Sequence, residues 1–217
     1  METHRSCETR GEEKLRCGSG NGGGNLEKFK TLKGTCSARL NIRRSQFISY
    51  VSPVSNLEEV RIFLKERVKK DATHNCYAYR ILEKGNILEF STDAGEPRGS
   101  AGLPILNVLR KRDLVNVVAL VIRYFGGKKL GVRGLIDAYS KVVEMSLKEC
   151  QEIIMVKMKK YTVFLKYEDM GKEMERISRY RILDMRYEKD GVEIVFLAKA
   201  QENLPGDFEE VYVPQFD

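Results

Sequence analysis

Residues 115–135 read VNVVALVIRYFGGKKLGVRGL, and they set the core of the fold. The first ten are apolar almost throughout, which predicts a strand buried on both faces of a sheet. A basic, glycine-rich turn follows, and residues 132–148 then place their apolar side chains on one side of a helix. A strand that leads through such a turn into a helix is a common way to build a phosphate-binding site.

The glycine-rich turn matches neither of two common nucleotide-binding motifs. A P-loop carries lysine and then serine or threonine directly after its last glycine, whereas Gly131 is followed by Val132 and Arg133. A dinucleotide-binding turn has the order G-x-G-x-x-G, whereas residues 126–134 have the order G-G-x-x-x-G-x-x-G. We therefore expect no nucleotide and no other cofactor.

The same turn has both a structural and an anion-binding interpretation. Gly126 and Gly127 allow positive φ at the end of a strand, and the later glycines allow a helix to approach a sheet closely. The turn also collects cations near a helix N-terminus, where they oppose the helix dipole. These cations are Arg123, Lys128, Lys129 and Arg133. A bound anion would relieve their repulsion, so we expect a polyanion-binding surface here.

Residues 92–102, TDAGEPRGSAG, form a second glycine-rich loop. Asp93 and Glu96 in this loop, with His74 on a preceding strand, are candidates for the acid–base groups of a hydrolase. Nothing in the sequence fixes their geometry. The carboxylates are better suited to turn hydrogen bonds and to the cap of a helix that begins near Pro104. We expect no catalytic residues, and these three side chains belong to the hydrolase alternative only.

The 217-residue chain is basic, with a net charge of +7 at neutral pH. Residues 26–150 carry 23 basic and 13 acidic side chains, whereas residues 151–217 carry 11 basic and 14 acidic ones. The positive field therefore belongs to the middle of the chain, which favours a polyanion or an acidic protein surface as partner. No apolar run is long enough to cross a bilayer, so we expect no membrane partner.

The five cysteines are widely spaced and odd in number, and the chain has no C-x-x-C. This pattern is typical of reduced thiols in a cytosolic protein and not of a disulfide framework. With only two histidines present, the sequence predicts no zinc or other metal site. The first residues lack the apolar segment of a secretory signal, and we expect a cytoplasmic protein.

The chain divides into three parts by composition. Residues 1–25 are polar and glycine-rich, and we expect either a disordered tail or an extension foreign to the native protein. Residues 26–152 are predicted to form the core domain and residues 153–217 a small second domain. The core is expected to have strands at 45–54, 74–82, 87–91 and 115–124, and helices at 57–70, 104–112 and 132–148. The second domain has the order strand, helix, hairpin and short last strand, which predicts a small sheet with helices on one face.

Four segments together resemble the Impact family in its bacterial and archaeal YigZ-type form. They are RRSQFISYVSPV (43–54), ATHNCYAYR (72–80), FSTDAGEPRGSAGLPILNVL (90–109) and VVALVIRYFGGKKLGVRGLIDAYSKVV (117–143). The resemblance covers about residues 31–150. It is specific because D-x-G-E-P-x-G-[ST]-A-G and R-[YF]-[YF]-G-G-x-x-L-G occur together and in this order.

The resemblance implies a two-domain α/β (α+β) fold. The core would be similar to domain IV of elongation factor G and to the second domain of a small-subunit ribosomal protein. The small C-terminal domain would be ferredoxin-like. Eukaryotic Impact proteins restrain a starvation-sensing kinase and carry an additional N-terminal domain, which residues 1–25 cannot supply. For YigZ-type members the resemblance implies binding to nucleic acid or to the ribosome.

We therefore expect a non-enzymatic binding protein linked to translation, with RNA or the ribosome as partner. The predicted contact residues are Arg98, Ser100, Arg123, Tyr124, Gly126, Gly127, Lys128, Lys129 and Arg133. Two alternatives stay open. One is a hydrolase that uses Asp93 and Glu96, and the other is a protein-interaction module that regulates translation by binding an acidic surface.

Overall fold

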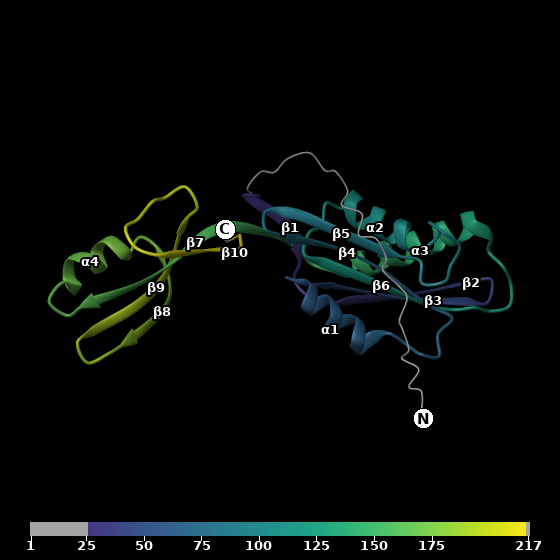
Figure 1. Cartoon of the computed structure of the whole chain (residues 1–217), viewed down its shortest axis with the longest axis horizontal. Helices are drawn as coiled ribbons and strands as arrows, with labels where there is room; N and C mark the ends of the chain where they lie inside the picture. The colour runs from purple at the N-terminus through teal and green to yellow at the C-terminus, as the bar shows by residue number, and fades with distance from the viewer. Residues whose placement is uncertain (1–25, 216–217) are drawn as a thin grey trace, which may run out of the picture.

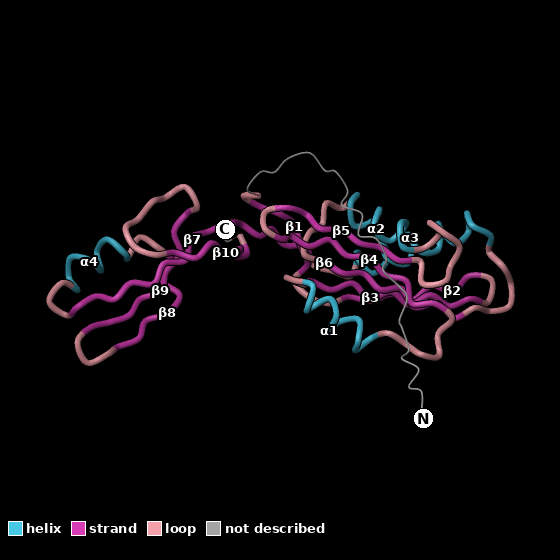
Figure 2. The backbone as a smooth tube through the Cα atoms, viewed as in Figure 1, coloured by secondary structure: helices cyan, strands magenta, loops and turns pink. Residues whose placement is uncertain are grey.

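The computed structural model describes residues 26–215, so the predictions for residues 1–25 lie outside the described part of the chain. The described residues form two antiparallel sheets with helices packed on them (Figure 1). Figure 2 shows the same elements coloured by type. The predicted mixed α/β fold is thereby confirmed. Within residues 26–215, no helix is long and apolar enough to cross a membrane.

The first sheet has the strand order β2-β3-β6-β4-β5. Its strands are β2 (Cys36–Ile42), β3 (Ser45–Pro53), β4 (His74–Glu83), β5 (Asn86–Thr92) and β6 (Val117–Tyr124). Helices α2 (Gly102–Lys111) and α3 (Gly131–Lys148) cover one face, and α1 (Leu57–Arg67) covers the other (Figure 1). β6 therefore lies in the middle of the sheet and between two layers of helix.

β6 is buried on both faces, as its apolar sequence predicts. Val117, Ala119 and Val121 belong to the core formed with α2 and α3. Val118, Leu120 and Ile122 belong to the core formed with α1. Residues 117–122 are each at most 1% exposed. One strand thus separates two apolar cores, and the end of that strand is held in place from both sides.

The second sheet contains the C-terminal part of the chain. Its strands are β1 (Lys28–Leu32), β7 (Glu152–Lys166), β8 (Arg181–Tyr187), β9 (Gly191–Lys199) and β10 (Phe208–Pro214), and α4 (Met170–Ile177) connects β7 to β8. The order β10-β7-β9-β8 is that of a ferredoxin-like domain, which confirms the predicted class. Residues 200–207 replace its second helix, and the Lys159 ammonium donates to the carbonyl oxygen of Glu202 (2.9 Å) in this loop.

The sequence predicts neither β1 nor the first part of β7. β1 pairs with residues 152–156 of β7, which lie far away in the chain. β1 also contacts the first sheet, because Leu32 belongs to the core beneath α2 and α3, and Lys30 accepts a backbone hydrogen bond from Val115 (2.8 Å). β1 thus links the two sheets, and the division of the chain near residue 152 stays a prediction.

Cys36 and Cys150 form a disulfide, which corrects the expectation of reduced thiols for this pair. Cys36 begins β2 and Cys150 follows α3, so two residues 114 positions apart meet where the chain passes between the sheets. Cysteine spacing could not reveal this pair, because the packing of α3 on β2 brings the two residues together. Cys76, in contrast, is a buried free thiol.

Reduction of the disulfide should lower the free energy of unfolding by about 4 to 5 kcal/mol, because a bridge that closes so long a loop strongly restrains the unfolded chain. Urea unfolding with and without a phosphine reductant measures this change. The double variant Cys36→Ser/Cys150→Ser is the control. Its free energy of unfolding should equal that of the reduced wild type and should not change when the reductant is added. Equal midpoints for the oxidised and reduced wild type would show that the bridge does not stabilise the fold.

Candidate nucleic-acid interface

Asp93 organises the loop between β5 and α2 through contacts to the backbone. Its carboxylate accepts hydrogen bonds from the N–H groups of Gly99 (2.7 Å), Ala101 (2.9 Å) and Gly102 (2.9 Å). Because Ala101 and Gly102 begin α2, the carboxylate also caps the N-terminus of this helix. Both carboxylate oxygens of Asp93 are therefore used by the fold.

Glu96 lies beneath the same loop, with 2% of its side chain exposed. One carboxylate oxygen accepts hydrogen bonds from the Arg123 guanidinium (2.6 Å) and from the Tyr139 hydroxyl (2.7 Å). The other oxygen lies 3.8 Å from Nε2 of His74, and Nδ1 of His74 lies 2.9 Å from the carbonyl oxygen of Ala94. These partners come from β4, β6 and α3, so Glu96 ties the loop to three elements.

This arrangement argues against the hydrolase alternative. Asp93 is bound by three backbone N–H groups, and Glu96 is buried against a guanidinium, so both carboxylates already bind groups of the protein. Burial raises the pKa of the Cys76 thiol to about 12, which keeps it neutral at pH 7 and unsuited as a thiolate nucleophile. Residues 26–215 contain no group of three or more His, Cys, Asp or Glu side chains that could hold a metal ion.

Arg123, predicted as a contact residue, is buried, which argues against a direct contact with a ligand. Its side chain is 6% exposed, and its guanidinium lies 5.4 Å from the ring centroids of both Phe47 and Phe125. The physical reason is the alternation of a strand: Arg123 has the same parity as Val121 and therefore points to the face of β6 that packs against α2 and α3. Continuing this alternation to the end of the apolar run would have identified the buried position from the sequence.

Four exposed cations line one open hollow of about 470 Å³ at the end of the first sheet: Arg43, Arg44, Lys128 and Lys129. Arg43 and Arg44 form the turn between β2 and β3, with φ of 45° and 70°. The two lysines belong to the loop between β6 and α3. None of the four takes part in an ion pair with another residue of 26–215, so the described part of the chain leaves their charges uncompensated. We call the hollow that these four residues line the basic hollow.

Gly126 explains why the two cationic turns lie together. A Cβ atom on Gly126 would lie 2.0 Å from the carbonyl oxygen of Arg44, so only glycine permits this approach. The Gly126 N–H also donates to the hydroxyl of Ser45 (3.2 Å). Figure 1 shows the β2–β3 turn and the β6–α3 loop at the end of the first sheet that lies far from the second sheet. These four cations therefore gather at one end of the first sheet.

The other predicted cations lie outside the basic hollow. Arg133 is in the first turn of α3, with 89% of its side chain exposed, and it lies 3.5 Å from the carboxylate of Asp137. Arg98 is exposed on the loop between β5 and α2. Neither side chain lines the hollow. Of the predicted cations, the structure thus brings only Lys128 and Lys129 together.

Ser100 and Tyr124, also predicted as contacts, serve the fold. Ser100 is fully buried and donates to the carbonyl oxygen of Pro97 (2.6 Å). Tyr124 is half-buried, and its hydroxyl donates to the carboxylate of Asp71 (3.3 Å). Gly127 takes a φ of +82°, which a side chain would strain. These positions shape the interface without offering a charge to a ligand.

Arg43 and Arg44 are the residues of the basic hollow that sequence reasoning missed. Their place beside residues 126–129 depends on the strand order β2-β3-β6, which the sequence does not give. The available signal was the Arg-Arg pair in a short connection between two strand-like segments, 36–42 and 45–53. The first of these segments was not predicted as a strand, so the pair could not be placed in a turn.

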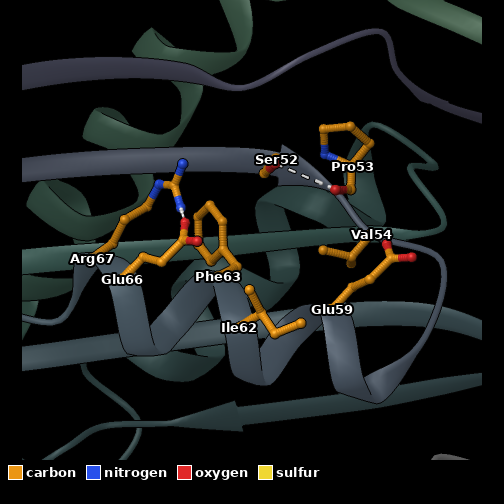
Figure 3. Close-up of a pocket in the computed structure, with 8 residues that line it drawn as sticks. All are labelled: Ser52, Pro53, Val54, Glu59, Ile62, Phe63, Glu66 and Arg67. Atoms are coloured by element: carbon orange, nitrogen blue, oxygen red, sulfur yellow. Dashed lines mark hydrogen bonds and ion pairs between the residues drawn. The ribbon is translucent and has the colours of Figure 1, made fainter.

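A second hollow, of about 220 Å³, lies between α1 and the end of β3 (Figure 3). Phe63 forms part of its wall, and the Arg67 guanidinium lies 4.4 Å from the centroid of the Phe63 ring. Glu66 pairs with Arg67 at 2.7 Å, and Glu59 adds a second carboxylate to the lining, so this hollow offers no surplus of positive charge. The uncompensated cations of the basic hollow make it the stronger candidate site.

Comparisons with known proteins find relatives over about half of the chain or more. Residues 43–147 match the Impact N-terminal domain. The chain is 45% identical over 125 residues to the IMPACT family member YvyE of Bacillus subtilis, which covers 56% of this chain and 57% of that relative. It is 31% identical over 145 residues to an IMPACT family member of Haemophilus influenzae, which covers 65% of this chain and 70% of that relative. The chain thus spans little more than half the length of YvyE.

One solved structure has the same fold. It is described as that of a hypothetical protein, and it matches with a TM-score of 0.59 over 81% of this chain and 88% of that chain, at 24% sequence identity. At this identity the likeness concerns the fold alone. The matched family region, residues 43–147, contains all four cations of the basic hollow and the buried Glu96–Arg123 pair.

The substitution Gly126→Ala should destabilise the protein by about 1 to 3 kcal/mol, because the new methyl group collides with the backbone of Arg44. Chemical unfolding of the purified variant measures the loss. Gly171→Ala is the matched control, since a Cβ at Gly171 meets no atom within 4 Å and should cost nothing. If Gly126→Ala unfolds at the same denaturant concentration as the wild type, the close approach of the two turns is wrong.

The substitution Glu96→Gln should cost about 3 to 5 kcal/mol, because it leaves the buried charge of Arg123 without a counterion. Thermal and urea unfolding monitored by circular dichroism give the loss. Glu173→Gln serves as the control, since it breaks only the exposed pair with Arg176 and should change stability by less than about 1 kcal/mol. A Glu96→Gln variant as stable as the wild type would mean that the carboxylate is free for another role, such as catalysis.

Proposed function

This chain belongs to the Impact family, and on that premise we propose that it is a non-enzymatic binding protein linked to translation whose basic core contacts RNA. The observation that carries the proposal is the basic hollow, where four cations face solvent together without a carboxylate among the described residues to pair with them. The proposal also revises the expected contact set, because Arg43 and Arg44 replace the buried Arg123.

A polyanion explains this arrangement better than a solvated surface does. Four like charges held at one end of a sheet repel one another, and phosphate groups would offset that repulsion. Guanidinium groups bind two phosphate oxygens at once, while lysine ammonium groups act as point charges. Gly126 and Gly127, between the two cationic turns, carry no side chains that would keep a phosphate away from the backbone. RNA supplies regularly spaced phosphates for such a surface.

An acidic protein surface is the second candidate partner, and the net charge of the middle of the chain favours it as well. RNA binding and protein binding differ in their response to nuclease and to salt. RNA binding weakens steeply as salt rises, because each phosphate contact releases counterions. A partner on the ribosome would also account for the expected cytoplasmic location.

RNA affinity should depend on the two lysines of the basic hollow. We expect Lys128→Gln/Lys129→Gln to weaken binding of a structured RNA and to reduce the slope of log affinity against log salt by about 1 for each lysine. Fluorescence anisotropy at a series of salt concentrations gives this slope. The matched control is Lys141→Gln/Lys148→Gln, which removes the same charge from a hollow on α3 that also contains Asp137 and Glu144.

An unchanged slope in the Lys128→Gln/Lys129→Gln variant, or an equal change in the control, would contradict the proposed interface. If the wild type binds RNA only weakly and without salt dependence, RNA is not its partner. A pull-down in which an acidic protein stays bound to this chain after nuclease treatment would then support the second candidate. The control keeps the test specific, because both double variants have the same net charge.

A further inference from the structure

Phe125 presents an aromatic ring to solvent between the buried end of β6 and the basic hollow. The residue is 43% exposed, although apolar residues 117–122 of the strand before it are almost completely buried. It is separated from Lys128 by the two glycines alone. An exposed aromatic ring beside uncompensated cations is the combination by which proteins bind nucleotides that are not base-paired.

The inner side of the Phe125 ring is supported by a buried stack. The Arg123 guanidinium lies 5.4 Å from the centroids of both the Phe125 and the Phe47 rings. Phe47 is fully buried, and Arg123 is held by Glu96, whose carboxylate also accepts a hydrogen bond from the Tyr139 hydroxyl. Each ring therefore makes a cation–π contact with the same guanidinium. The stack fixes one side of Phe125 and leaves part of the ring open.

The backbone of Phe125 is also fixed on both sides. Its N–H donates to the hydroxyl of Thr73 (3.0 Å), and the next N–H, of Gly126, donates to the hydroxyl of Ser45 (3.2 Å). Gly126 in turn lies against the backbone of Arg44. The backbone that carries the ring is consequently held by residues at the ends of β3, β4 and β6 and does not belong to a free loop. Such preorganisation lowers the entropy cost of binding a flat ligand.

We propose that Phe125 is a stacking platform for an unpaired base, and that the phosphates of the same strand lie on the basic hollow. The ligand class is therefore single-stranded RNA or an unpaired loop of a structured RNA, and this inference rests on the proposed RNA-binding function. A continuous duplex keeps its bases stacked on one another and offers none to Phe125. In this arrangement Arg123 is a positioning residue, because its charge is neutralised by Glu96 and it acts through the ring.

The chain contains no tryptophan, so a tryptophan introduced at this position reports on stacking directly. We expect the fluorescence of Phe125→Trp to be strongly quenched when a single-stranded oligoadenylate is added, because the base stacks on the indole. The control is Tyr187→Trp, at a position that is 68% exposed in β8 of the second sheet. Its fluorescence should not change. Quenching of both variants, or of neither under conditions where anisotropy shows binding, would overturn the stacking platform.

Affinity gives a second readout that does not depend on the reporter. We expect Phe125→Leu, which keeps an apolar side chain, to bind the single-stranded oligonucleotide about 5- to 100-fold more weakly while its affinity for a blunt RNA duplex stays unchanged. If the wild type binds both RNAs equally and Phe125→Leu has no effect, the platform is refuted while RNA binding by the basic hollow stands. If the wild type binds neither RNA, the proposed function fails as well.

Discussion

The buried ion pair between Glu96 and Arg123 is the contact on which the site depends. It joins the loop before α2 to the end of β6, and the Tyr139 hydroxyl adds a bond from α3. Two charges removed from water cost several kcal/mol unless hydrogen bonds satisfy them, and here Nε of Arg123 is buried without a hydrogen-bond partner among the described residues. The pair is therefore better understood as fixing the geometry of two loops than as a source of stability.

Buried and exposed cations therefore have different roles in this structure. The buried guanidinium of Arg123 positions the chain where it leaves β6, and Gly126 then brings the turn of Arg43 and Arg44 against it. The helices show the same contrast. Asp93 supplies a carboxylate to the N-terminus of α2, whereas the first turn of α3 has no acidic residue and follows Lys128 and Lys129. The exposed charges are thus the ones left for a partner.

The long apolar run was enough to predict β6, its double burial and the helix after it, because strand and helix periods are local properties of the sequence. The register of distant strands is not local. For this reason β1, β2, the Cys36–Cys150 bridge and the place of Arg43 and Arg44 could not be predicted. Arg123 was predicted as a contact residue from its charge alone, although its parity with Val121 already indicated a buried side chain. The hydrogen bonds of Asp93 to the turn backbone were predicted from the sequence. The ion pair of Glu96 with Arg123 could be recognised only from the fold.

The central claim is that buried Arg123 builds the site while exposed Arg43 and Arg44 bind the ligand. The most direct test follows the Nε–H resonances of the arginine side chains by 15N NMR, with and without a single-stranded RNA. The account predicts that the Arg123 resonance exchanges slowly with water, whereas RNA shifts the resonances of Arg43 and Arg44. Exchange of Arg123 as fast as that of an exposed arginine, or RNA-induced shifts confined to arginines of the second sheet, would contradict the account.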